Sequence, residues 1–216
     1  MFIDGGMSEY FAAPARSLVP LPTGLDAADA CLIEPASVAW HACRLAGLGP
    51  EQRVAVVGGG AIGLLTVAAA QHMGAAELSL EARHKHQREV GEQLGASSVD
   101  GVYDVVFEAA GSGSALHRAV QLARPGGTMV VVGVYDADVV WPQYECFIKE
   151  LRTIPSLGFC HHEGGSDYLS AATMLAHRPE LAASLITQRF PIDDAPEAFR
   201  VAADKSTDAL RVVIEP

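Results

Sequence analysis

The sequence predicts an α/β fold in which a doubly wound parallel sheet carries helices on both of its faces. Short apolar strands alternate with helical segments through the middle of the chain, at the spacing of β–α–β units. Near residue 58, a valine-rich strand runs directly into a glycine-rich loop and an alanine-rich helix. Half of the 216 residues are hydrophobic, which is enough for one good core or two small ones.

The most informative stretch spans residues 53–73. Residues 53–57 predict a buried strand, and Gly58, Gly60 and Gly63 follow with G-x-G-x-x-G spacing before an apolar helix. In Rossmann folds such glycines allow a tight turn, close approach of the backbone to a pyrophosphate, and tight packing of helix on strand. The start of the helix, with Ala61 and Ile62, offers free N–H groups to phosphates. The motif predicts a nucleotide site, and a purely structural glycine turn is the alternative.

The following segments continue the alternation of strands and helices. Strands are expected at 77–81, 103–108, 128–132 and 153–159, and helices at 84–94, 114–123 and 143–150, with a turn at 124–127. Ligands of parallel sheets lie beyond the carboxyl ends of the strands. We therefore expect the loops at 58–63, 109–111 and 133–134 to line one crevice.

The start of the chain differs in character from the middle. Residues 8–13 and 18–21 are strand-like pieces broken by prolines, and they bury little by themselves. Asp26 or Asp29 is expected to cap a short helix through Ile33. Glu34-Pro35 should then interrupt the chain before a second helix at 36–45.

The end of the chain also differs from the middle. A strand at 186–190, a helix from Asp193 or Asp194 through Ala203, and a closing strand at 210–214 are expected. This β–α–β ending resembles an addition to another domain more than a continuation of the sheet.

Composition excludes several classes of function. The net charge of −11 and a pI near 5.1 argue against nucleic acid as a partner, because phosphate backbones require a basic face. Neither a membrane span nor a signal peptide is expected, since no apolar run is long enough and the first residues lack a basic and an apolar region. Four scattered cysteines without a C-x-x-C pair indicate reduced thiols and a cytoplasmic location, with a metal or disulfide set as the alternative.

Motifs along nearly the whole chain resemble one family in their order. They are Gly6-Met7-Ser8-Glu9-Tyr10, Leu18-Val19-Pro20-Leu21-Pro22, Ile33-Glu34-Pro35-Ala36-Ser37-Val38, the glycine loop, Phe107-Glu108-Ala109-Ala110-Gly111, Pro125-Gly126-Gly127 and Arg189-Phe190-Pro191. The sequence resembles the zinc-type medium-chain alcohol dehydrogenases, especially the branch of sorbitol and threonine dehydrogenases. The resemblance implies hydride transfer between an alcohol or polyol and NAD(P), with zinc polarising the alcohol oxygen.

The resemblance also implies a domain organisation. Residues 37–183 would form the dinucleotide-binding domain, and residues 1–36 and 184–216 would be remnants of a chaperonin-10-like, β-rich catalytic domain. In the family, most of that domain, with its Cys and His-Glu zinc ligands, precedes the Gly-x-x-Glu-Tyr motif. The chain is therefore expected to be N-terminally truncated, with residues near 153–159 pairing subunits in a homo-oligomer.

Glu34 is the remaining candidate of the zinc shell. By resemblance, the glutamate of this Glu-Pro motif contacts the catalytic zinc or its bound water, so we assign Glu34 a catalytic and metal-binding role. A capping or solvated carboxylate is the alternative. One carboxylate cannot hold zinc tightly, because catalytic sites use three protein ligands. We expect this chain not to retain zinc and to show little zinc-dependent turnover by itself.

The end of the second strand predicts the choice of coenzyme. The acid that binds the ribose in NAD enzymes lies about 20 residues past the fingerprint, and here Ala82 takes that place. Arg83 follows, with His84, Lys85 and His86 nearby, and these side chains could pair with a 2′-phosphate. We therefore favour NADP. Glu81 could instead serve NAD, and the basic patch could be the solvated start of the next helix.

The remaining candidates flank the coenzyme. By resemblance, the nicotinamide half is flanked by Ala109, Ala110, Gly111, Val132, Gly133 and Val134. Arg211 takes the place of a basic residue that approaches the pyrophosphate, or else is a surface arginine. His161-His162 favours a loop role, and His41 and His72 favour packing or surface roles within helices.

Three other functions compete with this interpretation. A methyltransferase that binds S-adenosylmethionine would suit Glu81, but the third glycine suits a pyrophosphate better. A non-catalytic nucleotide-binding remnant or interaction subunit is favoured by the missing zinc ligands. A zinc-free quinone or enoyl reductase would have no use for Glu34.

Overall fold

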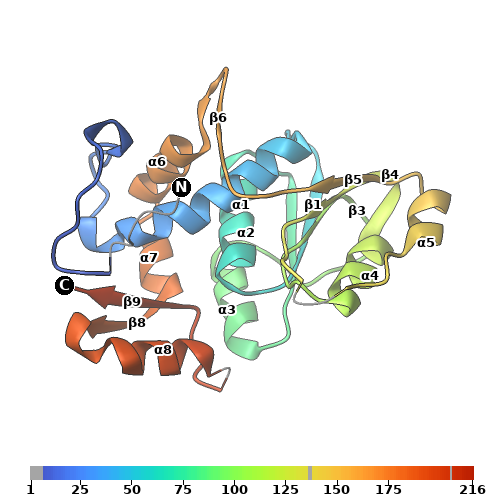
Figure 1. The fold of residues 1–216 in the computed structure, drawn as a ribbon. Helices are drawn as coiled ribbons and strands as arrows, with labels where there is room; N and C mark the ends of the chain where they lie inside the picture. Colours follow the sequence, from blue (N-terminus) through green and yellow to red (C-terminus); the bar gives the residue numbers. More distant parts are fainter. Residues whose placement is uncertain (1–6, 136–137, 205) are drawn as a thin grey trace. The chain divides into compact units, whose positions relative to one another are not determined.

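A computed structural model describes residues 7–135, 138–204 and 206–216 (Figure 1). The chain divides into two compact units. One is Ile33–Met174, and the other combines the segments before Ile33 and after Met174. The first unit holds the parallel sheet, and the second holds the small sheet formed by the end of the chain.

The sheet of the first unit has five parallel strands in the order β2-β1-β3-β4-β5. The strands are β1 (Arg53–Val57), β2 (Glu77–Glu81), β3 (Tyr103–Glu108), β4 (Ala123–Val131) and β5 (Arg152–Pro155). An isolated parallel bridge joins Ser97 to Ser79 of β2. With Ser97 counted as a minimal strand, the order in space becomes 3-2-1-4-5-6, which is that of dinucleotide-binding folds.

Helices cover both faces of this sheet. They are α1 (Ile33–Ala46), α2 (Ala61–His72), α3 (Lys85–Gln93), α4 (Gly113–Leu122) and α5 (Gln143–Ile148). On one face, Leu116 and Val120 of α4 pack against Ala55, Val106 and Met129 in a buried cluster. Side chains alternate along a strand, so the neighbouring residues point to the opposite face, where Leu80 meets α3 at Gly91.

The chain leaves this sheet through a short hairpin of β6 (His161–His162) and β7 (Gly165–Ser166) and then α6 (Asp167–His177). Helix α6 spans the boundary between the two units. No helix in the described ranges combines the length and apolarity that a membrane crossing requires.

The second unit is built on a parallel pair of strands, β8 (Ile186–Pro191) and β9 (Arg211–Glu215). Its helices are α7 (Glu180–Leu185) and α8 (Ala195–Ala203), and its 3₁₀ turns are η1 (Ala15–Ser17), η2 (Ala27–Leu32) and η3 (Ile192–Asp194). Arg189 ties three of these segments together: its guanidinium donates to Asp29, to the carbonyl of Ala28 and to Glu215.

Most predicted elements are confirmed. The predicted α/β class with a doubly wound parallel sheet is observed, and so are the strands at 53–57, 77–81 and 103–108 and the parallel β–α–β ending. The predicted helix after the glycine loop is also observed, and it begins at Ala61, three residues earlier than the apolar run that starts at Leu64.

Four expectations are wrong in detail. Residues 8–13 and 18–21 form no strand within the described residues, because these segments find no strand edge to pair with. Glu34-Pro35 does not interrupt a helix: both residues lie in the first turn of α1, where proline is tolerated because its missing N–H has no helical partner anyway.

The other two errors concern strands. The expected turn at 124–127 is a distorted start of β4, with a shift in register against β3 and a left-handed Gly126. The strand expected at 153–159 ends at Pro155: the N–H of Ser156 still donates to the carbonyl of Val131 at 2.9 Å, but Gly158, at a φ of +64°, leaves the extended conformation.

Candidate functional site

The glycine loop adopts a conformation that its glycines alone permit. Gly58 follows β1 at a φ of +118°, and its N–H donates to the carbonyl of Glu81 at 2.9 Å. A Cβ on Gly63 would lie 1.8 Å from the carbonyl oxygen of Gly58, so α2 can pack this closely on the loop only because Gly63 has no side chain.

The N-terminus of α2 faces open space. Gly60 precedes the helix as its N-cap, and no side chain caps the first N–H groups. A Cβ built on Gly60 would meet no atom within 4 Å. The first turn, from Ala61 through Gly63, therefore presents unpaired N–H donors and the positive end of the helix dipole toward a free volume. Such a site suits a phosphate group.

Two further loops lie against the glycine loop, and a third lies against one of these two. A Cβ on Gly58 would come within 2.7 Å of the nitrogen of Ala110, and one on Gly59 within 2.5 Å of the Cβ of Ala82. In the same way, a Cβ on Gly111 would lie 2.3 Å from the carbonyl oxygen of Val134. The structure therefore brings together the candidate residues at 58–63, 82, 109–111 and 132–134, along the carboxyl ends of β1, β2, β3 and β4. These four strands are neighbours in the sheet, and Figure 1 labels β1, β3 and β4 among them.

Glu108 fixes two of these loops, a role that the sequence analysis missed. It is fully buried at the end of β3, and its carboxylate accepts hydrogen bonds from the nitrogens of Ala110 and Gly111 at 2.9 and 2.8 Å. Tyr135 donates its hydroxyl to the other oxygen at 2.7 Å. Burial and this hydrogen bond raise the pKa of Tyr135, which keeps the hydroxyl protonated as the donor. A charged residue at the end of a buried strand was the available signal.

The end of β2 carries the residues expected to choose the coenzyme. Ala82 is half-buried beside Gly59, and Arg83 is exposed, with no partner for its guanidinium among the described residues. Arg88 donates to the carbonyls of Ala82 and Arg83 at 3.0 and 2.8 Å and so fixes the turn. Lys85 is paired with Glu89 at 3.0 Å.

Glu34 was expected to contact a catalytic zinc, and this role stays a prediction. It is exposed in the first turn of α1, where the helix dipole stabilises its negative charge, and its carboxylate has no partner among the described residues. Among the described residues, the other ligand groups that a catalytic zinc requires are not gathered around Glu34, so these residues alone do not fit that metal. The expectation that Glu34-Pro35 separates two helices is wrong, because both residues lie within α1.

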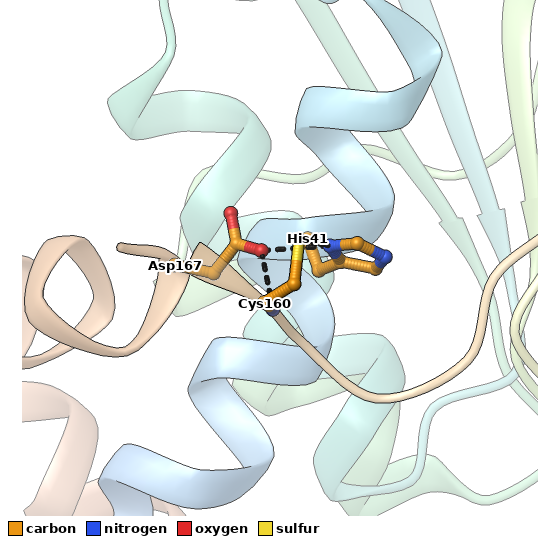
Figure 2. A group of neighbouring side chains, drawn as sticks. All are labelled: His41, Cys160 and Asp167. Atoms are coloured by element: carbon orange, nitrogen blue, oxygen red, sulfur yellow. Dashed lines mark hydrogen bonds and ion pairs between the residues drawn. The ribbon is translucent and has the colours of Figure 1, made fainter. Parts of the chain in front are cut away.

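The described part of the chain gathers one group of potential metal ligands, formed by His41, Cys160 and Asp167 (Figure 2). Arg44 occupies the position that a cation would take. Its Nη2 lies 3.0 Å from His41 Nδ1, 3.2 Å from Asp167 Oδ2 and 3.3 Å from Cys160 Sγ. The guanidinium already neutralises the carboxylate, so this group is an internal ion pair.

The same geometry excludes a nucleophilic triad. His41 turns one nitrogen, Nδ1, toward both Asp167 at 2.7 Å and Cys160 at 3.9 Å, whereas a triad uses the two ring nitrogens separately. Burial would raise the pKa of Asp167, but hydrogen bonds from Arg44, the Cys160 amide and His41 outweigh it and hold that pKa well below its usual range. The cluster thus anchors the loop before α6 to α1.

The histidines take structural positions. His41 is buried in this cluster, and the His72 ring is tilted against Trp40 at 5.3 Å between centroids. His161 and His162 form β6 of the hairpin. Arg211 lies on β9 in the other compact unit, where it lines an apolar groove with Phe199, so its approach to a pyrophosphate stays a prediction.

Strand order and glycine loop together define a Rossmann-type α/β domain. The family described as glucose dehydrogenase C-terminus matches residues 27–215 of this chain. Sorbitol dehydrogenase 1 of Saccharomyces cerevisiae is 29% identical over 235 residues, which cover 98% of this chain and 65% of that protein. L-idonate 5-dehydrogenase of Escherichia coli is 30% identical over 224 residues, covering 97% of this chain and 64% of that protein. The chain therefore belongs to the zinc-type alcohol dehydrogenase family.

Solved structures agree with this assignment. A protein described as a zinc-binding dehydrogenase from Sinorhizobium meliloti, bound to NADP, superimposes with a TM-score of 0.85 at 28% identity, covering 99% of this chain and 66% of that one. The Escherichia coli L-idonate 5-dehydrogenase gives a TM-score of 0.81 at 29% identity, covering 91% and 60%. The chain spans about 65% of the length of the curated relatives it matches.

Proposed function

We propose that this chain binds NADP as the coenzyme-binding part of an oxidoreductase that acts on an alcohol or polyol. The observation that carries the proposal is the uncapped N-terminus of α2 facing open space beside Gly60. The relatives named for sorbitol and L-idonate support the substrate class. The nicotinamide, when bound, supplies or accepts the hydride.

Each loop has a role in this proposal. The amides of Gly60 through Gly63 hold the pyrophosphate, and Arg83 pairs with the 2′-phosphate while Ala82 leaves room for it. The loops at 109–111 and 132–134, fixed by Glu108, flank the nicotinamide and exclude water from one side of it. Arg211 approaches the pyrophosphate from its own unit. No step is assigned to zinc, because the residues around Glu34 do not fit it.

Gly60 offers a sharp test of the proposal. Gly60→Ala adds a methyl group that meets no protein atom and sits at a φ of −71°, so the free chain should keep its stability. The methyl group enters the space assigned to the pyrophosphate and should weaken NADPH binding, followed by its fluorescence, by about tenfold or more. Gly49→Ala is the matched control, since that position is equally open and lies before β1.

The outcomes of this test decide whether the glycine loop binds the coenzyme. Unchanged NADPH affinity in Gly60→Ala, or no binding by the original chain, would contradict it. A second readout is turnover with NADP, zinc and a panel of polyols. We expect none from these 216 residues alone, which the lack of a fitting zinc site favours. Binding without turnover also describes the second candidate function, a non-catalytic nucleotide-binding subunit.

We further propose that the chain forms a homo-oligomer through β5. This strand is the outer strand of the sheet, so one side of it has unpaired backbone groups. Large apolar side chains are exposed next to it, including Phe147 and Ile148 of α5 and Leu157 just beyond β5. Two copies could join their sheets edge to edge and bury these groups.

The remaining expectations complete the proposal. Residues 37–183 are proposed as the dinucleotide-binding domain, with 1–36 and 184–216 as parts of the catalytic domain, which the separate second unit supports. A cytoplasmic location is supported by four free cysteines, since oxidising compartments favour disulfides.

A further inference from the structure

A salt bridge links the end of β2 to helix α4. Glu81 is the last residue of β2, opposite Val57 in the register, and its carbonyl accepts the N–H of Gly58. Its backbone therefore lies next to the glycine loop, and its carboxylate points toward Arg118 of α4. Nε of Arg118 donates to both carboxylate oxygens, at 3.0 and 2.8 Å, and both side chains are about one-third exposed.

Glu81 lies one residue before the position at which an acid decides the choice of coenzyme. In dinucleotide-binding folds an acid after the second strand binds the ribose hydroxyls of NAD, and its charge repels the 2′-phosphate of NADP. In this chain Ala82 holds the usual position, and the nearest acid is Glu81, one residue earlier. A free Glu81 would place a negative charge beside the phosphate that Arg83 is proposed to bind.

We infer that Arg118 determines the coenzyme specificity by neutralising Glu81. The guanidinium binds the carboxylate that would otherwise serve NAD, and it removes the charge that would oppose NADP. Without Arg118, the charge of Glu81 would cancel that of Arg83. With Arg118 present, the three side chains have a net positive charge at the end of β2. This inference rests on the proposed NADP site and assigns Arg118 a positioning role, without contact to the coenzyme.

The test compares affinities for NADPH and NADH, titrated separately against purified chains. Arg118→Gln should weaken NADPH binding by about tenfold and leave NADH binding unchanged or tighter, because Glu81 becomes free. The double variant R118Q/E81Q, which lacks the carboxylate, should return the NADPH affinity to within about threefold of the original. Arg118→Lys, which retains the charge, should largely keep the preference.

Arg124→Gln is the matched control. Arg124 forms an ion pair of the same kind with Asp104 at 2.6 Å, near the start of β3 and thus at the opposite end of the strands from the crevice. Its loss should leave the ratio of the two affinities unchanged. If R118Q weakened the binding of NADPH and NADH equally, or if R118Q/E81Q did not recover the affinity for NADPH, the inference would be overturned. NADPH binding by the original chain would still uphold the proposed site. Binding of neither coenzyme by the original chain would overturn both.

Discussion

At the scale of single residues, the guanidinium of Arg44 takes the place of a metal cation. Its Nη2 lies at the point that a metal bound by His41, Cys160 and Asp167 would occupy. The side chain of Asp167 is fully buried, so its charge requires a partner inside the protein. The arginine thus explains why a group with the composition of a metal site does not need a metal.

This explanation predicts the behaviour of Arg44→Leu. The variant should lose about 2 kcal/mol in free energy of unfolding, since His41 and the Cys160 amide still bond the carboxylate. It should also gain a dependence on Zn²⁺ that the original chain lacks, visible as a rise in the urea midpoint. The second substitution in R44L/C160S should abolish the rise. An equal response to Zn²⁺ in the original chain would refute this role of Arg44.

At the scale of elements, Glu108 couples the end of β3 to the end of β4. Its side chain binds the turn at 109–111, and its carbonyl accepts the N–H groups of Val132 and Gly133 at 2.8 and 3.0 Å. Gly133 could not carry a side chain here, since a Cβ would lie 2.4 Å from Glu108 Oε2. The side chain and the backbone carbonyl of one buried residue together set the spacing of two loops of the crevice.

Substitution of Glu108 measures this coupling. Glu108→Ala leaves the N–H groups of Ala110 and Gly111 and the hydroxyl of Tyr135 without their acceptor, and it should lower the free energy of unfolding by about 3 kcal/mol. Tyr135→Phe removes one hydrogen bond and should cost about 1 kcal/mol. Both values come from urea unfolding followed by circular dichroism. Glu108→Ala with the stability of the original chain would show that the loops hold their positions without it.

The elements also show what the sequence could predict. The valine-rich β1, the glycine loop and the start of α2 follow from local pattern, because strand, turn and helix propensities act on neighbouring residues. The hairpin at 161–166 and the start of α6 depend on Asp167 meeting His41, which lies 126 positions away. No local periodicity records such a contact, and the Glu81–Arg118 pair escaped prediction for the same reason.

The Glu34-Pro35 motif gives the opposite case, in which a local pattern predicted a helix break that the structure does not have. The motif matched a family pattern, and proline was given its usual weight as a helix breaker. The structure places Pro35 in the first turn of α1, which tolerates it, and leaves Glu34 exposed. The position of a proline within a helix thus decides whether it ends the helix, and the role of Glu34 toward zinc stays a prediction.

At the scale of the whole molecule, the order of the strands places the crevice. With the Ser97 bridge included, the order reverses between β1 and β3, and ligands of such sheets bind outside the carboxyl ends at this switch point. The glycine loop follows β1, and the turn at 109–111 follows β3, so both border the switch point. Topology and glycine pattern independently indicate the same site.

A crystal structure of the chain grown with NADP tests this claim most directly. We expect the pyrophosphate within hydrogen-bonding distance of the amides of Gly60 through Gly63, and the 2′-phosphate beside Arg83. Electron density for the coenzyme at another place on the chain, or a crevice left empty at saturating NADP, would contradict the assignment.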